Sequence, residues 1–255
     1  MPLSTLAVIP ARLGATRLPG KPLLLLGGEP LIAQVWRRVA ESGIADRCVV
    51  ATDSHQIKDA LTAAGGESVL TRSEHPSGTD RVAEVAAMAA FHEYSVIINV
   101  QGDEPFVPDS AIRGAASMVS DGQFQLGTAA AVASPSILES QHVVKVVTAD
   151  DGRALYFSRA PIPFLRDSSD TVERDDRIRQ HIGVYAYTRE SLAQWVALPP
   201  HPLERIERLE QLRPIAAGIS MGVMVIDEPA PEGIDTAEDL ERANARWTHH
   251  FAGRY

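Results

Sequence analysis

The sequence predicts an α/β protein with a doubly wound, mostly parallel, Rossmann-like sheet and a smaller inserted or appended subdomain. Short β-branched runs alternate with segments of helical period in the first half of the chain, as in proteins with a parallel sheet. Hydrophobic residues make up 45% of the 255 residues, so a chain of this length can bury a large core. The sequence contains neither a clear linker nor an internal repeat, which favours one domain over residues 1–255.

The alternation begins with LAVIPA (6–11), a short apolar segment typical of a buried strand. Residues 30–43 follow with helical period, with Pro30 in the first turn and Gly43 just beyond the end. The same criteria predict strands at 48–53, 68–71 and 95–105, and helices at about 54–64 and 79–92. We expect Thr79 to cap the last of these helices.

The second half of the chain is less regular. Residues 166–179 are highly charged and have no apolar period, which is typical of a solvated loop. The helical period of 203–213 predicts one amphipathic helix with Leu203, Ile206, Leu209 and Leu212 facing inward. Further elements are expected as strands at 126–133, 143–149 and 183–188 and as helices near 189–197 and 236–250.

Composition excludes several classes of protein. The net charge of −9 argues against a broad nucleic-acid surface, which needs a concentrated positive field. The single cysteine, Cys48, rules out a disulfide framework and fits a reducing cytoplasm. No apolar run approaches the ~18 residues of a membrane span. The first residues also lack the pattern of a signal peptide, so we expect a cytoplasmic protein that does not interact with membranes.

A loop rich in glycine and basic residues, PARLGATRLPGK (10–21), follows the first strand. It departs from the phosphate-loop pattern because five residues separate its glycines and proline follows the lysine. The glycine fingerprint of dinucleotide-binding proteins is absent, which disfavours an NAD-dependent enzyme. We therefore expect the loop to wrap an anion with glycine-permitted turns and with the side chains of Arg12, Arg17 and Lys21. On these residues alone, a solvated surface loop remains an alternative.

Asp103, in QGDEP, follows the clearest buried strand of the sequence. In an open parallel sheet ligands bind beyond the carboxyl ends of the strands, so Asp103 and the basic loop are predicted at one edge. Cations beside a carboxylate suit a polyphosphate with Mg²⁺, which prefers oxygen ligands. The alternative for Asp103 is a turn residue or a helix cap.

A third polar element is GIDTAEDLERANA (233–245). Thr236 and Asp239 match a helix-capping pattern. From these residues alone, Asp235 belongs to the helix start rather than to a metal site.

Six segments together resemble one family of enzymes. They are IPARLGATRLPGKPL, TRSEHPSGTDRVAEV, NVQGDEP, ALYFSRAPIP, ERLEQLR and GIDTAEDLER, and they span residues 8–242. The chain resembles the 3-deoxy-manno-octulosonate cytidylyltransferases, also called CMP-Kdo synthetases, in the order and the sequences of these segments. The resemblance implies transfer of CMP from CTP to the anomeric hydroxyl of 3-deoxy-D-manno-octulosonate (Kdo). The products would be pyrophosphate and CMP-Kdo for lipopolysaccharide biosynthesis.

The resemblance also assigns the nucleotide side of the reaction. It implies that Asp103 and Asp235 hold Mg²⁺, and that Arg12 and Lys21 bind the CTP phosphates. These four residues would form the catalytic set, with Arg17 as a further phosphate contact. We expect the cytosine near the backbone of Pro10 and Ala11 and near SGTD. There, Ser77 and Gly78 would accept a hydrogen bond from its exocyclic amine.

On the sugar side, the family's YFSR motif implies that Arg159 binds the Kdo carboxylate. Without the resemblance, a structural salt bridge explains this arginine equally well. His181 and Tyr185 are predicted on one face of a strand, with His181 as a hydroxyl contact rather than a base. Gln180 stands where the family commonly has arginine, which puts the strength of anion binding there in doubt.

Gln101, Glu210 and Gln211 are further candidates for contacts to the sugar hydroxyls. For the last two, the ordinary helix predicted over 203–213 is a sufficient explanation. The resemblance also implies a homodimer and places sugar binding and dimerisation at about 126–215.

Two other functions remain open from the sequence. One is a cytidylyltransferase for another acidic sugar, such as 8-amino-Kdo or a relative of sialic acid. The other is a non-catalytic nucleotide-binding module, against which the presence of both Asp103 and Asp235 argues.

Overall fold

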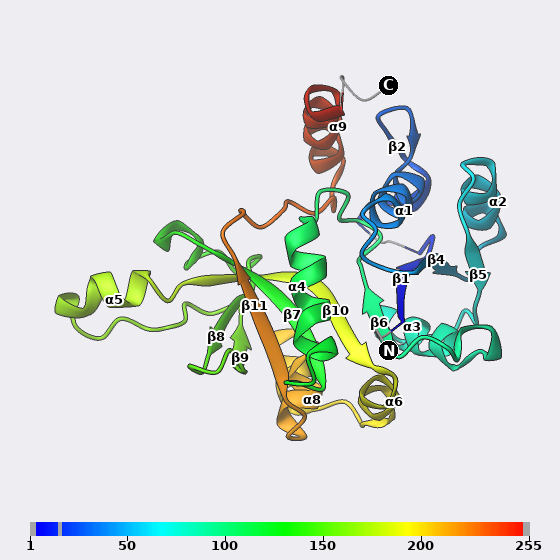
Figure 1. Cartoon of the computed structure of the whole chain (residues 1–255). Helices are drawn as coiled ribbons and strands as arrows, with labels where there is room; N and C mark the ends of the chain where they lie inside the picture. The colour runs from blue at the N-terminus through cyan, green and yellow to red at the C-terminus, as the bar shows by residue number, and fades with distance from the viewer. Residues whose placement is uncertain (1–3, 15–16, 252–255) are drawn as a thin grey trace. The chain divides into compact units, whose positions relative to one another are not determined.

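The computed structural model describes residues 4–14 and 17–251 and divides into two compact units (Figure 1). The first unit contains Met1–Phe106 and Pro231–Tyr255, and the second contains Val107–Ala230. The predicted subregion at about 126–215 falls inside the second unit. One domain over 1–255 stays a prediction, because compact units of this kind can be parts of one domain.

The first unit is built on four parallel strands. Their spatial order is β6-β1-β4-β5, and they are β1 (Thr5–Ala11), β4 (Arg47–Thr52), β5 (Ser68–Leu70) and β6 (Val96–Asn99). Each carries the apolar run that the sequence predicted, and β6 is buried throughout. The chain proceeds from β1 outward to β5 and then returns to the other side of β1. The neighbours β1 and β6 therefore form a topological switch point, beyond which ligands bind in open α/β sheets.

Helices α1 (Leu31–Glu41), α2 (His55–Ala63) and α3 (Gly78–Ala87) cover these strands. Helix α9 (Ala237–Phe251) packs against the hairpin of β2 (Leu25–Leu26) and β3 (Glu29–Pro30), as the red and blue ribbons show (Figure 1). Asn244 of α9 accepts from the Gly27 N–H at 2.9 Å and donates to the Leu25 carbonyl at 3.0 Å. The last segment of the chain is thereby attached to the segment that follows the basic loop.

The second unit contains a mixed sheet. Strand β11 (Met221–Ile226) runs parallel to β7 (Leu126–Val132), and β10 (Arg179–Thr188) runs antiparallel to β7. Strand β8 (Lys145–Thr148) pairs antiparallel with β9 (Ala154–Ser158), and it also pairs with β10 at one register position.

Helix α4 (Asp109–Ser120) packs against β7, β10 and β11 (Figure 1). The approach requires glycine at 127, because a Cβ there would lie 2.1 Å from the Ala115 carbonyl oxygen. The other helices of the second unit are α5 (Thr171–Asp175), α6 (Arg189–Ala197), α7 (Pro202–Glu207) and α8 (Leu212–Ala216). Short 3₁₀ turns complete the two units at Lys21–Leu23, Ala89–Phe91, Pro135–Ile137 and Ser168–Asp170.

The mostly parallel α/β fold is confirmed, but several local predictions are wrong. Helix α3 is capped by Ser77, not Thr79, because the extended backbone of Ser77 lets its hydroxyl accept from the Asp80 N–H. The predicted helix at 203–213 is broken into α7 and α8 by Arg208, whose φ of 57° is left-handed. Ile206, predicted inward, is 76% exposed. The charged segment 166–179 contains α5 as well as loop.

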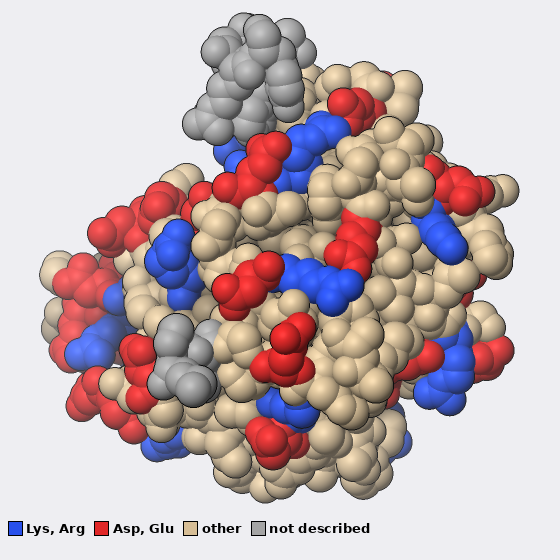
Figure 2. Space-filling model, turned by 45° about the vertical axis from the view of Figure 1, so that its right-hand side comes forward, with Lys and Arg blue, Asp and Glu red and all other residues tan. Residues whose placement is uncertain are grey.

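The surface agrees with the composition. Figure 2 shows acidic and basic side chains interspersed on the face in view, without a broad basic area. Among the described residues, no helix combines the length and the apolar character that crossing a bilayer requires.

Candidate active site

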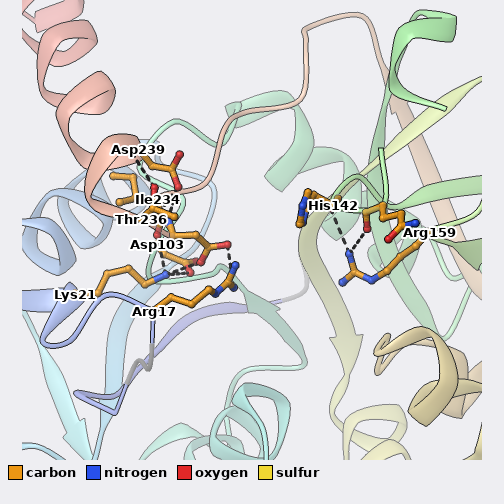
Figure 3. Close-up of polar contacts among 10 residues, drawn as sticks. Arg17, Lys21, Asp103, His142, Arg159, Ile234, Thr236 and Asp239 are labelled. Carbon is orange, nitrogen blue, oxygen red and sulfur yellow. Dashed lines mark hydrogen bonds and ion pairs between the residues drawn. The ribbon is translucent and has the colours of Figure 1, made fainter. Parts of the chain in front are cut away.

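The side chain of Lys21 lies at the centre of a polar cluster in the first unit (Figure 3). Its Nζ donates to Asp103 Oδ2 at 2.6 Å, to the Ile234 carbonyl at 2.7 Å and to Asp235 Oδ1 at 3.0 Å. Gly20, with a φ of 69°, makes the left-handed turn that precedes Lys21. The strand-end rule predicted the meeting of Lys21 with Asp103, whereas Asp235 was expected beside them only from the family resemblance.

Two sets of hydrogen bonds hold the carboxylates beside Lys21. The Ile234 N–H donates to the Asp103 carbonyl at 3.0 Å, which joins the segment before α9 to the end of β6. Thr236 and Asp239 form a reciprocal cap at the start of α9, at 2.8 and 3.2 Å. Because these two residues cap the helix, the Asp235 carboxylate is left to pair with Lys21 and, at 3.1 Å, with Arg17 Nη2 (Figure 3).

The cluster stabilises the charged form of Lys21. Burial lowers its pKa, but the charge and hydrogen bond of Asp103, with those of Asp235, outweigh burial and raise the pKa above its ordinary value. At Glu104, next along the chain, the surroundings favour the neutral form instead. Burial raises its pKa to about 8, and the charges of Asp103 and Asp235 act in the same direction. One buried oxygen of Glu104 has no hydrogen-bond partner in the described structure. No pattern in the sequence indicated this buried carboxyl group.

The predicted cytosine residues also lie together. A Cβ on Gly78 would contact the Pro10 ring at 3.3 Å, and one on Gly102 would lie 3.0 Å from the Pro10 carbonyl oxygen. Glycine at both positions lets the chain approach the end of β1 closely. The hydroxyl of Ser77 is engaged with Asp80, at 2.7 Å.

The basic side chains of the loop differ in environment. Arg12 is exposed and has no hydrogen bond or ion pair within the described residues, whereas Ala11 beside it is buried. Arg17 is also exposed but pairs with Asp235. Arg12 is therefore open to solvent at the carboxyl end of β1.

Arg81, the arginine of SGTDR, was not among the predicted site residues. It is 3% exposed, and it bonds Thr71 after β5 and Asp53 after β4, the latter at 3.2 Å. Its guanidinium thus joins the carboxyl ends of two neighbouring strands next to the SGTD segment. Two signals in the sequence could have identified it, namely its place in the SGTDR motif and on the apolar face of the helix predicted over 79–92.

Arg159, in the second unit, is held almost entirely by backbone groups (Figure 3). Its Nε donates to the Glu207 carbonyl and its Nη1 to the Gln141 carbonyl, both at 3.0 Å. Within the described residues its guanidinium forms no ion pair, and Nη2 has no partner. The alternative of a structural salt bridge is therefore not what this arrangement shows.

His181 and Tyr185 are neighbours on β10, as the alternation predicted, with ring centroids 5.5 Å apart. Burial lowers the pKa of His181 to about 3, so its ring is neutral at neutral pH. The hydroxyl of Thr128 lies 2.7 Å from the Val184 carbonyl and 3.0 Å from His181 Nε2. Because that hydroxyl gives its one proton to the carbonyl, Nε2 must donate to it, which leaves His181 Nδ1 as an acceptor.

The remaining sugar candidates are placed on different elements. Gln101 follows β6 in the first unit and is half-buried. Glu210 and Gln211 lie between α7 and α8 in the second unit, with Glu210 half-buried and Gln211 buried. They do not belong to one continuous helix, so the ordinary-helix explanation for them is wrong.

Three comparisons bear on these observations. The family model described as "Cytidylyltransferase" matches residues 6–225. A 3-deoxy-manno-octulosonate cytidylyltransferase from Gemmatimonas aurantiaca is 58% identical, covering 96% of this chain and 95% of that protein. One of the same name from Stenotrophomonas maltophilia is 46% identical, covering 93% and 94%. A solved CMP:2-keto-3-deoxy-manno-octonic acid synthetase complexed with CTP has 36% identity and a TM-score of 0.88, covering 96% and 99%.

The α/β fold, with its polar cluster at the switch point, and the family match together identify a nucleotidyltransferase. The similarity extends over nearly the whole chain and to relatives well above 30% identity. The chain belongs to the cytidylyltransferase family and, within it, to the 3-deoxy-manno-octulosonate cytidylyltransferases.

Proposed function

We propose that this chain transfers CMP from CTP to the anomeric hydroxyl of Kdo and releases pyrophosphate. The observation that carries the proposal is the cluster of Lys21, Asp103 and Asp235 at the end of β6, within a chain related to Kdo cytidylyltransferases over nearly its whole length. In this reaction the sugar hydroxyl attacks the α-phosphorus in line, so catalysis depends on positioning and on charge stabilisation.

The basic residues of the 10–21 loop bind the triphosphate in this proposal. The exposed guanidinium of Arg12 has no competing partner within the described residues and takes phosphate oxygens. The ammonium of Lys21 remains charged beside its carboxylates and stabilises charge on the phosphates. Arg17 contributes through its contact with Asp235 and from its exposed position.

Asp103 and Asp235 are proposed to hold Mg²⁺. The two carboxylates fit this role because both already reach one cationic nitrogen, that of Lys21, at 2.6 and 3.0 Å. Within the described residues, no group of three His, Cys, Asp or Glu side chains could hold a metal. Two carboxylates with phosphate oxygens and water complete the ligand set that Mg²⁺ prefers. When bound, the metal supplies positive charge to the phosphates and lowers the pKa of the attacking hydroxyl.

In this proposal, residues of the second unit contact Kdo, and Gln101 of the first unit stays a predicted hydroxyl contact. Arg159 offers Nη2 to the sugar carboxylate, because its Nε and Nη1 are held by carbonyl groups. Neutral His181 accepts a hydrogen bond from a sugar hydroxyl, with Tyr185 beside it. Glu210 and Gln211 contact further hydroxyls.

Arg159→Lys is expected to raise the KM for Kdo at least about tenfold and to leave the KM for CTP nearly unchanged. Lysine keeps the charge but loses the planar fork that bonds two carbonyl groups while a third nitrogen faces the ligand. Arg159→Ala should have the larger effect in the same direction. Steady-state kinetics on both substrates, with melting curves, check this. Equal losses for both substrates with a lower melting temperature would return Arg159 to a structural role.

A panel of acidic sugars tests the proposed function. Purified protein is incubated with CTP, Mg²⁺ and either Kdo, 8-amino-Kdo or a sialic acid, and pyrophosphate release is measured. Kdo should give the highest kcat/KM. A higher kcat/KM with another sugar would make that sugar the substrate instead of Kdo. A complete lack of turnover with every sugar would support a non-catalytic nucleotide-binding module.

The protein is proposed to act as a homodimer. The three most exposed large hydrophobic side chains among the described residues are Phe164, Val172 and Ile206, at 75–79% exposure, and all belong to the second unit. Exposed apolar side chains of this size favour association. Sedimentation equilibrium is expected to give twice the 27.5-kDa chain mass, and Phe164→Asp should shift the protein toward monomer. A wild-type protein that stays monomeric at tens of micromolar would contradict this.

The cellular setting is also a proposal. CMP-Kdo would serve as activated sugar for lipopolysaccharide biosynthesis. The only cysteine, Cys48, is free and buried, which fits a reducing compartment such as the cytoplasm.

A further inference from the structure

Lys145 is a buried charged residue that the proposed reaction does not use. It has no exposed surface, yet its Nζ is fully satisfied by three backbone carbonyls. The acceptors are Ser140 at 2.9 Å, Val143 at 2.8 Å and Arg159 at 2.5 Å. A buried ammonium costs free energy unless such bonds replace water. Its position between the 140–143 segment and Arg159 therefore points to a specific role.

Glu207 contacts the same arginine from another element. Its carboxylate accepts from the Ser158 hydroxyl at 2.6 Å and from the Arg159 N–H at 3.0 Å. Its carbonyl accepts from Arg159 Nε at 3.0 Å. That carbonyl is available because α7 ends there, at the left-handed turn of Arg208.

Together these contacts use almost every polar group of Arg159. Lys145 takes its carbonyl, Glu207 takes its N–H and Nε, and Gln141 takes Nη1. The Gln141 carbonyl belongs to the segment that Lys145 itself holds at Ser140 and Val143. Lys145 thus fixes both the backbone of Arg159 and one acceptor of its side chain.

The charges of Lys145, Arg159 and Glu207 are arranged so that the Arg159 guanidinium has no ion pair. Lys145 and Arg159 are cations, and Glu207 is the one carboxylate hydrogen-bonded to either of them in the described structure. The carboxylate of Glu207 bonds the backbone N–H of Arg159 rather than its guanidinium, and only the Glu207 carbonyl reaches Nε, so the guanidinium is oriented without an ion pair. A guanidinium oriented in this way can bind an anion through Nη2 without first changing its position.

We infer that Lys145 and Glu207 are positioning residues that set the Arg159 guanidinium for the carboxylate of the sugar. The inference rests on the proposed function, because it takes the sugar acid as the anion. Fixing the side chain before binding removes an entropic cost from the association and aligns the nitrogen with its partner.

Glu207→Gln tests the inference, because glutamine keeps the shape of the side chain and one acceptor while removing the charge. We expect the KM for Kdo to rise about tenfold and the KM for CTP to stay within about twofold of wild type. Lys145→Met, which leaves three carbonyls unpaired, should act in the same direction and is measured as a second variant. Each variant is also made in an Arg159→Ala background, where it should add no further loss for Kdo.

Glu204→Gln is the matched control. Glu204 lies on the same helix, α7, but pairs with Arg213 and the His201 N–H rather than with Arg159. Its loss should lower the melting temperature without separating the two KM values.

Three outcomes overturn the inference: no effect of either variant on the KM for Kdo, equal losses for Kdo and CTP, or additive losses in the Arg159→Ala background. An unchanged KM for Kdo in Arg159→Ala overturns it as well. Each of these is distinguishable from failure of the proposed function, in which the wild-type protein itself would show no turnover of CTP with Kdo.

Discussion

Asp103→Asn is expected to lower kcat by at least about 100-fold, with little change in the melting temperature. An amide is nearly the same shape as the carboxylate but carries no charge to offset that of a metal ion or of Lys21. In the structure Asp103 lies 2.6 Å from Lys21 Nζ and is part of the proposed Mg²⁺ site. Asp235→Asn should behave similarly. Pyrophosphate release at saturating CTP and Kdo measures the effect.

Asp121→Asn is the control for this experiment, because Asp121 is exposed at the end of α4, within the second unit. It should retain wild-type turnover. Exhaustive chelation of the wild-type enzyme should reduce turnover as strongly as the substitution does, and added Mg²⁺ should restore it. Undiminished activity in chelator, together with an active Asp103→Asn variant, would remove the metal role from these carboxylates.

Lys21→Met is expected to raise the KM for CTP by about 10- to 150-fold, which corresponds to the loss of one charge-assisted contact worth about 1.5–3 kcal/mol. Methionine retains the length and apolar stem of lysine but cannot donate to phosphate oxygens. It also leaves Asp103 and Asp235 without the shared ammonium that now separates their charges. The KM for Kdo should change much less, so steady-state kinetics on each substrate distinguish the two effects.

Lys58→Met, on helix α2, provides the comparison with another half-buried lysine of the same unit. It should leave both KM values unchanged. A Lys21→Met enzyme with wild-type CTP dependence would exclude Lys21 from the nucleotide site, whatever happened to its stability.

The part of the fold that positions the nucleotide candidates could be predicted because local signals were strong there. The buried runs of β1 and β6 end in polar residues, and the strand-end rule then brings Lys21 and Asp103 to one edge. Thr236 and Asp239 cap α9 as the sequence pattern indicated. What the pattern did not show is that this cap frees Asp235 to pair with Lys21, since that pairing depends on tertiary contact.

The second unit was harder to predict because its elements are short or interrupted. No element was predicted from the sequence over α4, β9 or β11, although α4 contacts three strands. The apolar period over 203–213 continues across Arg208, but the backbone of Arg208 is left-handed. Glycine or asparagine is the usual residue in that conformation, so arginine gave no warning of the break. The bonds of Lys145 and Glu207 to Arg159 join residues 14 and 48 positions apart, which no local pattern reveals.

The single proton of the Thr128 hydroxyl gives the hydrogen bonds around His181 a fixed polarity. His181 Nε2 donates to the Thr128 hydroxyl, and that hydroxyl donates to the Val184 carbonyl. His181 therefore presents a lone pair at Nδ1. A sugar substituent that reaches this nitrogen must therefore be a donor. A hydroxyl and an amine satisfy it alike, whereas a fluorine or a ketone at the same carbon meets two acceptors face to face. If His181 contacts the sugar as proposed, a deoxyfluoro analogue at that carbon should bind more weakly than the hydroxyl compound because of the polarity of this contact.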